Sequence, residues 1–228
     1  MSDLSTNFEL AKSQANTKAL PLAAVSYEGL GKRLFDIVAV IAILPILLPL
    51  VALLALLVRL DGGPAFFAQT RIGQGGRSFR CFKLRTMRVN AEAELARMCA
   101  ADPAIAREWE VNQKLENDPR ITRVGQFLRR TSLDELPQFF NVLFGSMSLV
   151  GPRPFMEEQE ECYRGAMGRA YYRMRPGITG LWQVAGRSTT AFVDRVRYDE
   201  RYYKRLSLSN DLWLCVMTVA VVLRQTGK

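Results

Sequence analysis

The pattern of hydrophobic and polar positions divides the chain into three parts. Residues 1–30 are polar and Ala-rich without sustained periodicity, which predicts a flexible leader. Residues 31–60 contain a continuous apolar run, in which no charged residue occurs from Ile37 to Val58. Residues 61–228 alternate between short apolar and polar stretches with turn signals, which predicts a folded domain.

The apolar run is the strongest single signal in the chain. As a helix it would be about 33 Å long, which is enough to cross a bilayer. Pro45 and Pro49 lie in its middle, and each removes a backbone donor and crowds the preceding turn, so a kink or reversal is expected. Basic residues flank both ends, and an excess of Lys and Arg marks the cytoplasmic side of a membrane protein. Both ends are therefore expected on that side.

These observations predict a re-entrant helix-break-helix over 31–60 that dips into one leaflet and returns. A kinked transmembrane helix and a buried core helix stay open as alternatives. Lys32, Arg33 and Asp36 are predicted to lie at the membrane edge. Because a carboxylate at this depth is costly when free, Asp36 is expected to be paired, next to the two cations.

The rest of the pattern predicts a domain of the α+β class that is mainly helical, with a short β-hairpin and amphipathic interfacial helices. The stretches "AFFAQ" and "FRCFKLRTM" predict two short strands around a "GQGG" turn. The apolar stretch near the C-terminus is too short to span a bilayer, so a core or interfacial helix is expected there. Helices are expected over 90–118 (interrupted at Pro103), 124–130, 132–145 (Ser132 as N-cap and Gly145 as stop), 192–205 and 212–223.

Composition narrows the chemistry. The formal net charge of +9 indicates an anionic partner, such as nucleic acid, a phospholipid membrane or a phosphorylated substrate. Nucleic acid is the weaker choice, because the apolar run has no role there and no RRM, KH or helix-turn-helix signature occurs. The chain has no histidine, so catalysis would fall to carboxylates, cysteine, lysine or tyrosine. The four cysteines form no CxxC pair, and reduced thiols in a compartment facing the cytoplasm are expected.

The densest candidate chemistry lies around Asp134 and Glu135 in "TSLDELPQ". Two acids in the first turn of a helix capped by Ser132 would be a sufficient structural explanation, because the helix dipole favours negative charge there. The basic residues near them in the sequence instead favour a functional explanation for the two acids. Arg129 lies just upstream, and Arg153 is held between two prolines in "GPRP", where its guanidinium could bind a phosphate.

The order of "KRLFD", the Pro-containing apolar segment, "FKLRTM", "SLDELPQFFNVLFGSMSLVGPRP" and "RPGITGLWQVAGR" resembles the bacterial sugar transferase family, the monotopic phosphoglycosyl transferases. The resemblance covers about residues 32–225 and is closest to the exopolysaccharide-initiating type. It implies transfer of a sugar 1-phosphate, galactose or glucose, from a UDP-sugar to undecaprenyl phosphate, with release of UMP. It also implies the bacterial inner membrane, with the catalytic domain 61–228 facing the cytoplasm. A catalytically inert basic membrane scaffold of a polysaccharide assembly complex is the alternative.

The resemblance also implies roles for individual residues. Asp134 would be the nucleophile that forms a phosphosugar–aspartyl intermediate, and Glu135 would bind Mg²⁺ or assist with proton and charge handling. Asp199 in "RYDERYY" would support the metal, which is expected to be Mg²⁺ or, in its place, Mn²⁺. The identity of the sugar is not readable, and a homo-oligomer is left open. The candidates for phosphate or nucleotide contacts are Arg153, Arg129, Lys83, Arg85 and Arg175.

Overall fold

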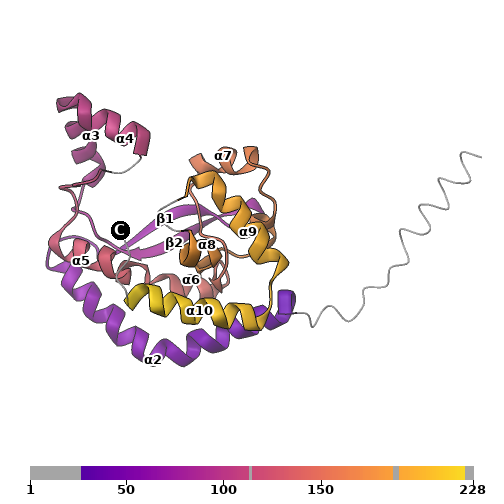
Figure 1. Ribbon diagram of the computed structural model, residues 1–228. Coiled ribbons are helices and arrows are strands. Elements are labelled where there is room, and N and C mark those ends of the chain that lie inside the picture. The colour runs from indigo at the N-terminus through magenta and orange to yellow at the C-terminus, as the bar shows by residue number, and fades with distance from the viewer. Residues whose placement is uncertain (1–26, 113–114, 187–189, 224–228) are drawn as a thin grey trace, which may run out of the picture.

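The computed structural model describes residues 27–112, 115–186 and 190–223. These residues form a mainly helical fold with two small two-stranded sheets (Figure 1), which confirms the predicted class. The longer elements are α2 (Lys32–Arg59), β1 (Phe66–Ile72), β2 (Ser78–Leu84), α3 (Ala91–Ala101), α4 (Pro103–Asn112), α5 (Arg123–Thr131), α6 (Gln138–Phe144), β3 (Ser148–Val150), α7 (Glu160–Gly165), β4 (Gly177–Thr179), α8 (Leu181–Ala185), α9 (Arg195–Lys204) and α10 (Leu208–Leu223). Short helical turns are η2 (Tyr27–Gly31), η3 (Gln74–Gly76), η4 (Leu133–Glu135), η5 (Glu157–Gln159), η6 (Ala170–Arg173) and η7 (Phe192–Asp194).

The apolar run forms a single helix, α2, which passes through Pro45 and Pro49. The predicted break is therefore wrong: the chain stays helical at both prolines. Each proline still removes one backbone donor, which weakens the hydrogen-bond ladder in the middle of the helix. Figure 1 shows α2 as a bent helix that runs beneath the rest of the domain.

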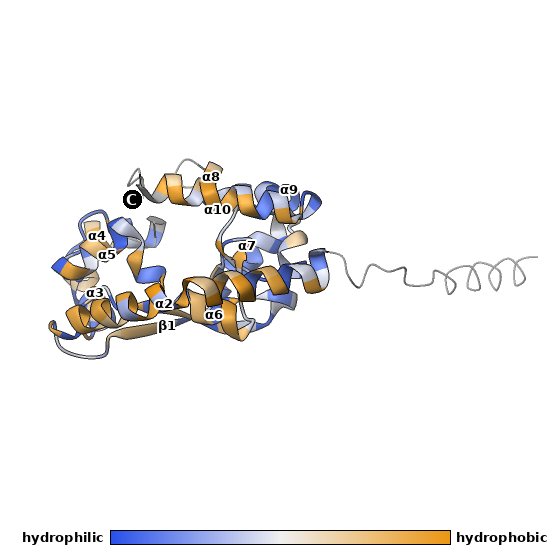
Figure 2. Ribbon diagram, turned by 90° about the horizontal axis from the view of Figure 1, so that it is seen from below, coloured by the Kyte–Doolittle hydropathy of each residue, from blue (hydrophilic) through white to orange (hydrophobic). Residues whose placement is uncertain are grey.

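One face of α2 packs on the domain and the opposite face is exposed. The buried stripe packs into two hydrophobic clusters, one with α6, β3 and α10, the other with β2 and α5. The whole segment Tyr27–Arg59 is long and apolar enough to cross a membrane by length and composition, and only 22% of its most apolar window is buried. Figure 2 shows apolar residues gathered along α2 and the neighbouring α6. The buried stripe contains Val40, Leu47, Val51, Leu54 and Val58, whereas Leu34, Val38, Ile41, Ile46, Leu53 and Leu56 are each more than half exposed.

The predicted hairpin is confirmed. β1 and β2 pair antiparallel, with Phe66 opposite Leu84 and Ile72 opposite Ser78. The connecting turn needs left-handed backbone at Gly75 (φ 72°) and at the following glycine (φ 77°), a conformation that glycine adopts without steric cost. The hairpin matters for the site because β2 carries Lys83.

A second sheet was not predicted from the sequence. The short strands β3 and β4 pair parallel, with Ser148 opposite Gly177 and Val150 opposite Thr179. Immediately after β3, the Gly151 N–H donates to the Thr179 carbonyl at 2.8 Å. The two backbones touch so closely that a Cβ on Gly177 would lie 2.1 Å from the Gly151 nitrogen. This contact fixes the start of the "GPRP" loop.

The other helix predictions hold with small changes. The predicted helix over 90–118 is divided at Pro103 into α3 and α4, and the one over 132–145 into the turn η4 and the helix α6. α9 lies within the predicted stretch 192–205, whereas α10 begins at Leu208, before the predicted start at residue 212. The interruption follows from proline chemistry, since Pro is tolerated in a first turn but not in a helix interior. Gly145 ends α6 at φ 86°, as predicted.

Candidate active site

Asp134 and Glu135 lie in the short turn η4, between α5 and α6. The predicted N-cap role of Ser132 is wrong, because its side chain makes no capping hydrogen bond. Its backbone instead adopts the left-handed region (φ 58°) and ends α5. The next α-helix begins only at Gln138. The two acids therefore do not occupy the first turn of an α-helix, and the dipole explanation for their presence loses its basis.

Glu135 is held by two cations. Its Oε1 accepts hydrogen bonds from Lys83 Nζ at 2.8 Å and from Arg153 Nη2 at 2.9 Å. Arg153 Nη1 also lies 3.4 Å from Oε2. Burial would raise the pKa of Glu135, but the charges of Arg153 and Lys83 outweigh burial and hold this pKa well below its usual range. Glu135 is therefore ionised and fully engaged with cations.

Asp134 has the opposite environment. It is 8% exposed, and within the described ranges its carboxylate makes no hydrogen bond or ion pair. Burial raises its pKa, and the neighbouring Glu135 charge adds to the effect. The charges of Lys83, Arg129 and Arg153 oppose that shift. Asp134 is thus a nearly buried carboxylate that is surrounded by positive charge but not bound by it.

A small cavity of about 130 Å³ opens beside this pair, and we call it the Arg153 pocket. Arg153 enters it from the loop after β3, where Gly177 N donates to the Pro152 carbonyl at 2.8 Å and fixes the backbone. Four cations line the pocket, and two of them bind Glu135, so the pocket is suited to an anion with several oxygens. Its lining is Arg71, Cys81, Lys83, Gln138, Arg153, Pro154, Met156, Gln159 and Arg195.

The other residues predicted to contact phosphate lie in different surroundings. Arg129 acts on Asp134 electrostatically, while its Nε donates to Thr86 Oγ1 at 2.8 Å. Arg85 instead binds the carbonyl of Val58 at 3.0 Å and that of Gly62, at the end of α2. Arg175 Nε donates to the Gly145 carbonyl at 2.9 Å, at the end of α6. Arg85 and Arg175 therefore stabilise helix ends, and their hydrogen bonds within the described residues do not reach Asp134.

The predicted three-carboxylate metal set is not assembled. Asp199, on α9, accepts a hydrogen bond from Tyr163 at 2.8 Å, and burial raises its pKa to about 7. Among the residues described, no three acidic or cysteine side chains gather closely enough to hold an ion. Glu135 would first have to release Lys83 or Arg153. Of the three predicted ligands, Asp134 is the one with a free carboxylate among the described residues that would be able to hold Mg²⁺, an ion usually bound through one or two carboxylates.

The membrane-edge residues bind the domain rather than one another. Asp36 is fully buried, and its Oδ1 accepts hydrogen bonds from Ser148 Oγ and Leu149 N, both at 2.9 Å. Asp36 therefore has hydrogen-bond partners in β3, and no ion pair with Lys32 or Arg33 occurs among the described residues. Lys32 instead forms a 2.6 Å ion pair with the buried Asp211 of α10. Arg33 binds the last carbonyls of α6, including that of Leu143 at 2.8 Å.

Sequence reasoning missed three polar residues that shape the site. Arg71 and Arg195 line the Arg153 pocket but belong to no motif that was singled out. Asn141 accepts a hydrogen bond from Phe82 N at 2.9 Å and donates to the Arg80 carbonyl at 2.7 Å, so it fastens α6 to the strand that carries Lys83. The signal for Asn141 was available, because it is the one polar residue within the apolar stretch "FFNVLF".

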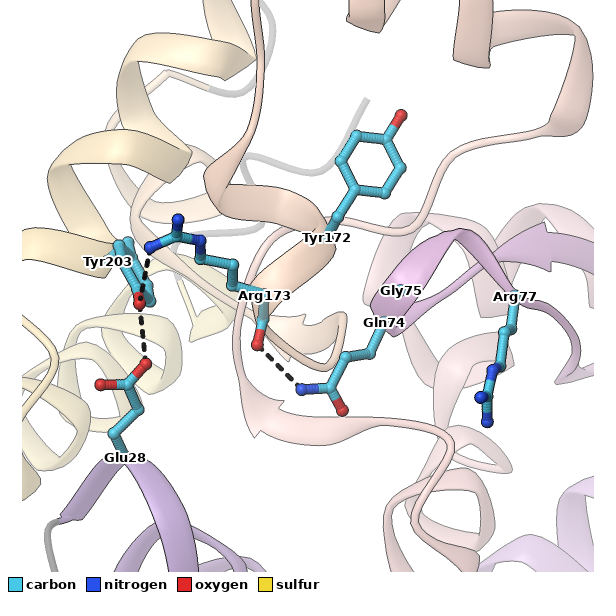
Figure 3. A pocket seen from close by; sticks show the side chains of 7 residues that line it. All are labelled: Glu28, Gln74, Gly75, Arg77, Tyr172, Arg173 and Tyr203. Atoms are coloured by element: carbon cyan, nitrogen blue, oxygen red, sulfur yellow. Dashed lines mark hydrogen bonds between the residues drawn. The ribbon is translucent and has the colours of Figure 1, made fainter. Parts of the chain in front are cut away.

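A larger hollow of about 500 Å³ lies elsewhere, between η3, η6 and α9. Figure 3 shows its side chains pointing in different directions: Tyr172 and Arg77 point apart, and Arg173 reaches toward Tyr203. The Tyr203 hydroxyl donates to Glu28 at 2.8 Å, and Gln74 binds the Arg173 carbonyl at 2.8 Å. These contacts join neighbouring elements, so Glu28, Gln74, Arg173 and Tyr203 are engaged with one another. The smaller Arg153 pocket is therefore the candidate site.

Comparison with known proteins assigns the chain to a family. The model of the family described as "Bacterial sugar transferase" matches residues 27–225, which include α2, Asp134 and the whole Arg153 pocket. The chain belongs to the bacterial sugar transferase family. It is 49% identical over 197 residues to an undecaprenyl-phosphate galactose phosphotransferase of Salmonella typhimurium, and 46% identical over 196 residues to a UDP-galactose-lipid carrier transferase of Erwinia amylovora.

These two matches cover 86% of this chain but only 41% of each relative, so the chain spans about two-fifths of their length. A shorter relative aligns over most of both proteins. The exopolysaccharide production protein ExoY of Sinorhizobium fredii is 43% identical over 200 residues, which are 87% of this chain and 88% of that one. The family thus includes both longer proteins and proteins close to this size.

Proposed function

We propose that this sugar transferase moves a sugar 1-phosphate, galactose or glucose, from a UDP-sugar to undecaprenyl phosphate and releases UMP. The observation that carries the proposal is Asp134: a buried carboxylate, without a partner among the described residues, beside a cationic pocket that suits phosphates. The names of the relatives agree, since they describe galactose and glucose transferases that act on undecaprenyl phosphate. An inert scaffold needs neither feature and is not favoured.

The reaction would proceed in two displacements. A carboxylate oxygen of Asp134 attacks the phosphorus that bears the sugar, the bond from that phosphorus to the bridging oxygen breaks, and UMP leaves with the bonding electrons. An oxygen of the acceptor phosphate then attacks the same phosphorus. The aspartyl–phosphorus bond breaks, and the free carboxylate of Asp134 is restored. No general base is needed for the first step, because the nucleophile is already an anion.

The remaining residues lower the repulsion between two anions. Lys83 and Arg153 are held in place by Glu135 and are available to phosphate oxygens from their other donors. Arg129 adds positive charge from the side of α5. Mg²⁺, when bound by Asp134 and the donor phosphates, supplies further charge neutralisation. Glu135 would act as a positioning residue in this account.

We also propose that α2 is re-entrant, with the catalytic domain on the cytoplasmic face of the bacterial inner membrane. Both ends of α2 are fastened to the same domain. At the N-terminal end Asp36 binds Ser148 and Leu149, and at the C-terminal end Arg85 binds the Val58 carbonyl. If α2 crossed the bilayer, these two contact sites of one domain would have to lie on opposite surfaces. The exposed apolar face of α2 supports burial of the bend in one leaflet.

Membranes that contain the full chain test the function directly. They are incubated with undecaprenyl phosphate, Mg²⁺ and one radiolabelled UDP-sugar at a time. We expect label in the lipid phase and equimolar UMP with UDP-galactose or UDP-glucose, and neither with the Asp134→Asn variant. If the wild-type protein is folded and transfers no label from any UDP-sugar, the proposed function is wrong.

A further inference from the structure

Two arginines of the Arg153 pocket have no role in the account above. Arg71 and Arg195 form no ion pair with a carboxylate in the part of the chain that the structure describes. Arg71 donates to Gln69 Oε1 at 2.6 Å, which is a neutral acceptor. The Nε atom of Arg195 is buried and has no hydrogen-bond partner there. Both guanidinium groups therefore lack a carboxylate in direct contact among the described residues, although Glu135 attracts Arg71 and Asp199 attracts Arg195 from a distance.

Aromatic rings fix the position of Arg195. Its guanidinium carbon lies 4.0 Å from the centre of the Trp182 ring and 4.8 Å from that of Phe192. Such stacking orients the planar group and leaves its edge donors free for a ligand. Trp182 is itself fixed, because its Nε1 donates to Thr190 Oγ1 at 2.9 Å. Arg195 is thus oriented before any ligand arrives.

The electrostatic cost of this arrangement indicates an anionic ligand. Burial lowers the pKa of Arg195 to about 10, and the nearby charge of Arg153 acts in the same direction. Burial also lowers the pKa of Arg71, with Arg153 again adding to the effect. Cations that are removed from water and lie near other cations destabilise a fold unless an anion compensates them. Glu135 binds Lys83 and Arg153 directly, whereas Arg71 and Arg195 have no carboxylate in contact among the described residues and are the two cations of the pocket left to a ligand.

We propose that Arg71 and Arg195 bind the phosphate that stays on the departing nucleotide, while Lys83 and Arg153 bind the phosphate that carries the sugar. Arg153 lies between the two phosphate positions in this assignment, because its charge acts on Asp134 and also on Arg71 and Arg195. Lys83 acts on Asp134, which places the attacked phosphate at that end of the pocket. The assignment rests on the proposed function and extends it, because it makes UMP a ligand in its own right.

Trp182 provides a direct reporter of nucleotide binding. The chain has three tryptophans, so Trp109→Phe and Trp213→Phe leave Trp182 as the single source of indole fluorescence. The full chain in lipid nanodiscs is titrated with UMP, and the donor KM and kcat are measured on the same preparations. Arg195→Gln and Arg71→Gln are the test variants, with Arg195→Lys as a version that keeps the charge. Arg173→Gln is the matched control, since Arg173 also stacks on an aromatic ring, at 5.6 Å from Tyr203, but outside this pocket.

We expect Arg195→Gln and Arg71→Gln each to weaken UMP binding about tenfold and to raise the donor KM by a similar factor, because a charge-assisted phosphate contact is lost. The kcat should change less than threefold, and Arg195→Lys should recover part of the affinity. Arg173→Gln should match the wild type. If both glutamine variants bind UMP within twofold of the wild type while sugar-phosphate transfer is normal, the inference is wrong and the proposed function stands. If the wild type transfers no sugar phosphate, both fail together.

Discussion

Asp134 and Glu135 are adjacent in the chain and opposite in their surroundings. Glu135 accepts hydrogen bonds from Lys83 and Arg153 at 2.8 and 2.9 Å, whereas the carboxylate of Asp134 has no such partner among the described residues. Neighbouring carboxylates thus take different tasks. The paired one holds two cations in place, and in the proposed reaction the unpaired one is the nucleophile.

The first prediction concerns pH. Burial raises the pKa of Asp134 above the ordinary value near 3.9, so protonation of this nucleophile begins at a higher pH than for an exposed aspartate. The rate of UMP release with donor alone should therefore be full above that raised pKa and fall as the pH drops through it. Single-turnover release avoids titration of the acceptor phosphate. A rate that stays constant down to pH 4 in a folded protein would contradict the assignment.

The second prediction concerns Glu135→Gln. Removing the charge frees Lys83 and Arg153 from their shared anchor, so the donor KM should rise and kcat should fall, together by about tenfold or more. Stability should drop by about 1–3 kcal/mol, because hydrogen bonds to a charged group are lost. The pKa of Glu135 is depressed, so its contribution is present at all pH values above the ordinary Glu range and disappears only on acidification below it.

Denaturant unfolding at pH 5 and pH 8 tests this pH dependence. The difference in free energy of unfolding between the wild type and Glu135→Gln should be the same at both pH values. Glu158→Gln removes an exposed carboxylate and is the matched control. If Glu135→Gln changes neither the donor KM nor kcat, Glu135 does not position the cations.

The chemistry of the site was easier to predict from sequence than its geometry. Asp134, Glu135, Lys83 and Arg153 stand in motifs, and the structure brings these four together. Arg71 could not be found this way, because it enters the pocket through the register of the β-hairpin, which single-sequence patterns do not define.

The fold, too, was predicted where the signals are local and missed where the contacts are distant in the sequence. Strong local signals identified the hairpin and most helices, since apolar periodicity and turn glycines act within a few residues. The β3–β4 sheet was not predicted, because each strand has only three residues and the two strands are far apart in the sequence. Ser148, for example, lies opposite Gly177. The partners of Asp36 could not be named for a similar reason, because Ser148 and Leu149 are more than a hundred residues away. In both cases the partners come from distant parts of the sequence, which a local pattern does not identify.

The third prediction tests that long-range contact. A Cβ on Gly177 would lie 2.1 Å from Gly151 N and 2.4 Å from the Thr179 carbonyl oxygen, so Gly177→Ala must push the "GPRP" loop away. We expect a loss of about 1–3 kcal/mol in stability and a larger proportional loss of transfer activity, because Arg153 moves with the loop. Gly165→Ala is the control, since nothing lies within 4 Å of its Cβ position. Equal behaviour of the two variants in thermal unfolding would contradict the account.

The fourth prediction concerns the metal. Chelation with EDTA should abolish transfer, and Mg²⁺ or Mn²⁺ should restore it, because the donor phosphates carry charge that the cations of the pocket only partly neutralise. Asp199→Asn should leave the Mg²⁺ concentration for half-maximal rate unchanged, since Asp199 binds Tyr163 rather than joining Asp134. A large increase in that concentration would restore Asp199 to the metal site.

The covalent intermediate on Asp134 tests the central claim most directly. The full chain is mixed with UDP-sugar in the absence of undecaprenyl phosphate, quenched, digested and analysed by mass spectrometry, with Asp134→Asn as the control. We predict that the peptide containing Asp134 gains the mass of one phosphosugar group, and that the control peptide does not. An unmodified Asp134 peptide in a preparation that turns over normally once the acceptor is added would contradict the account.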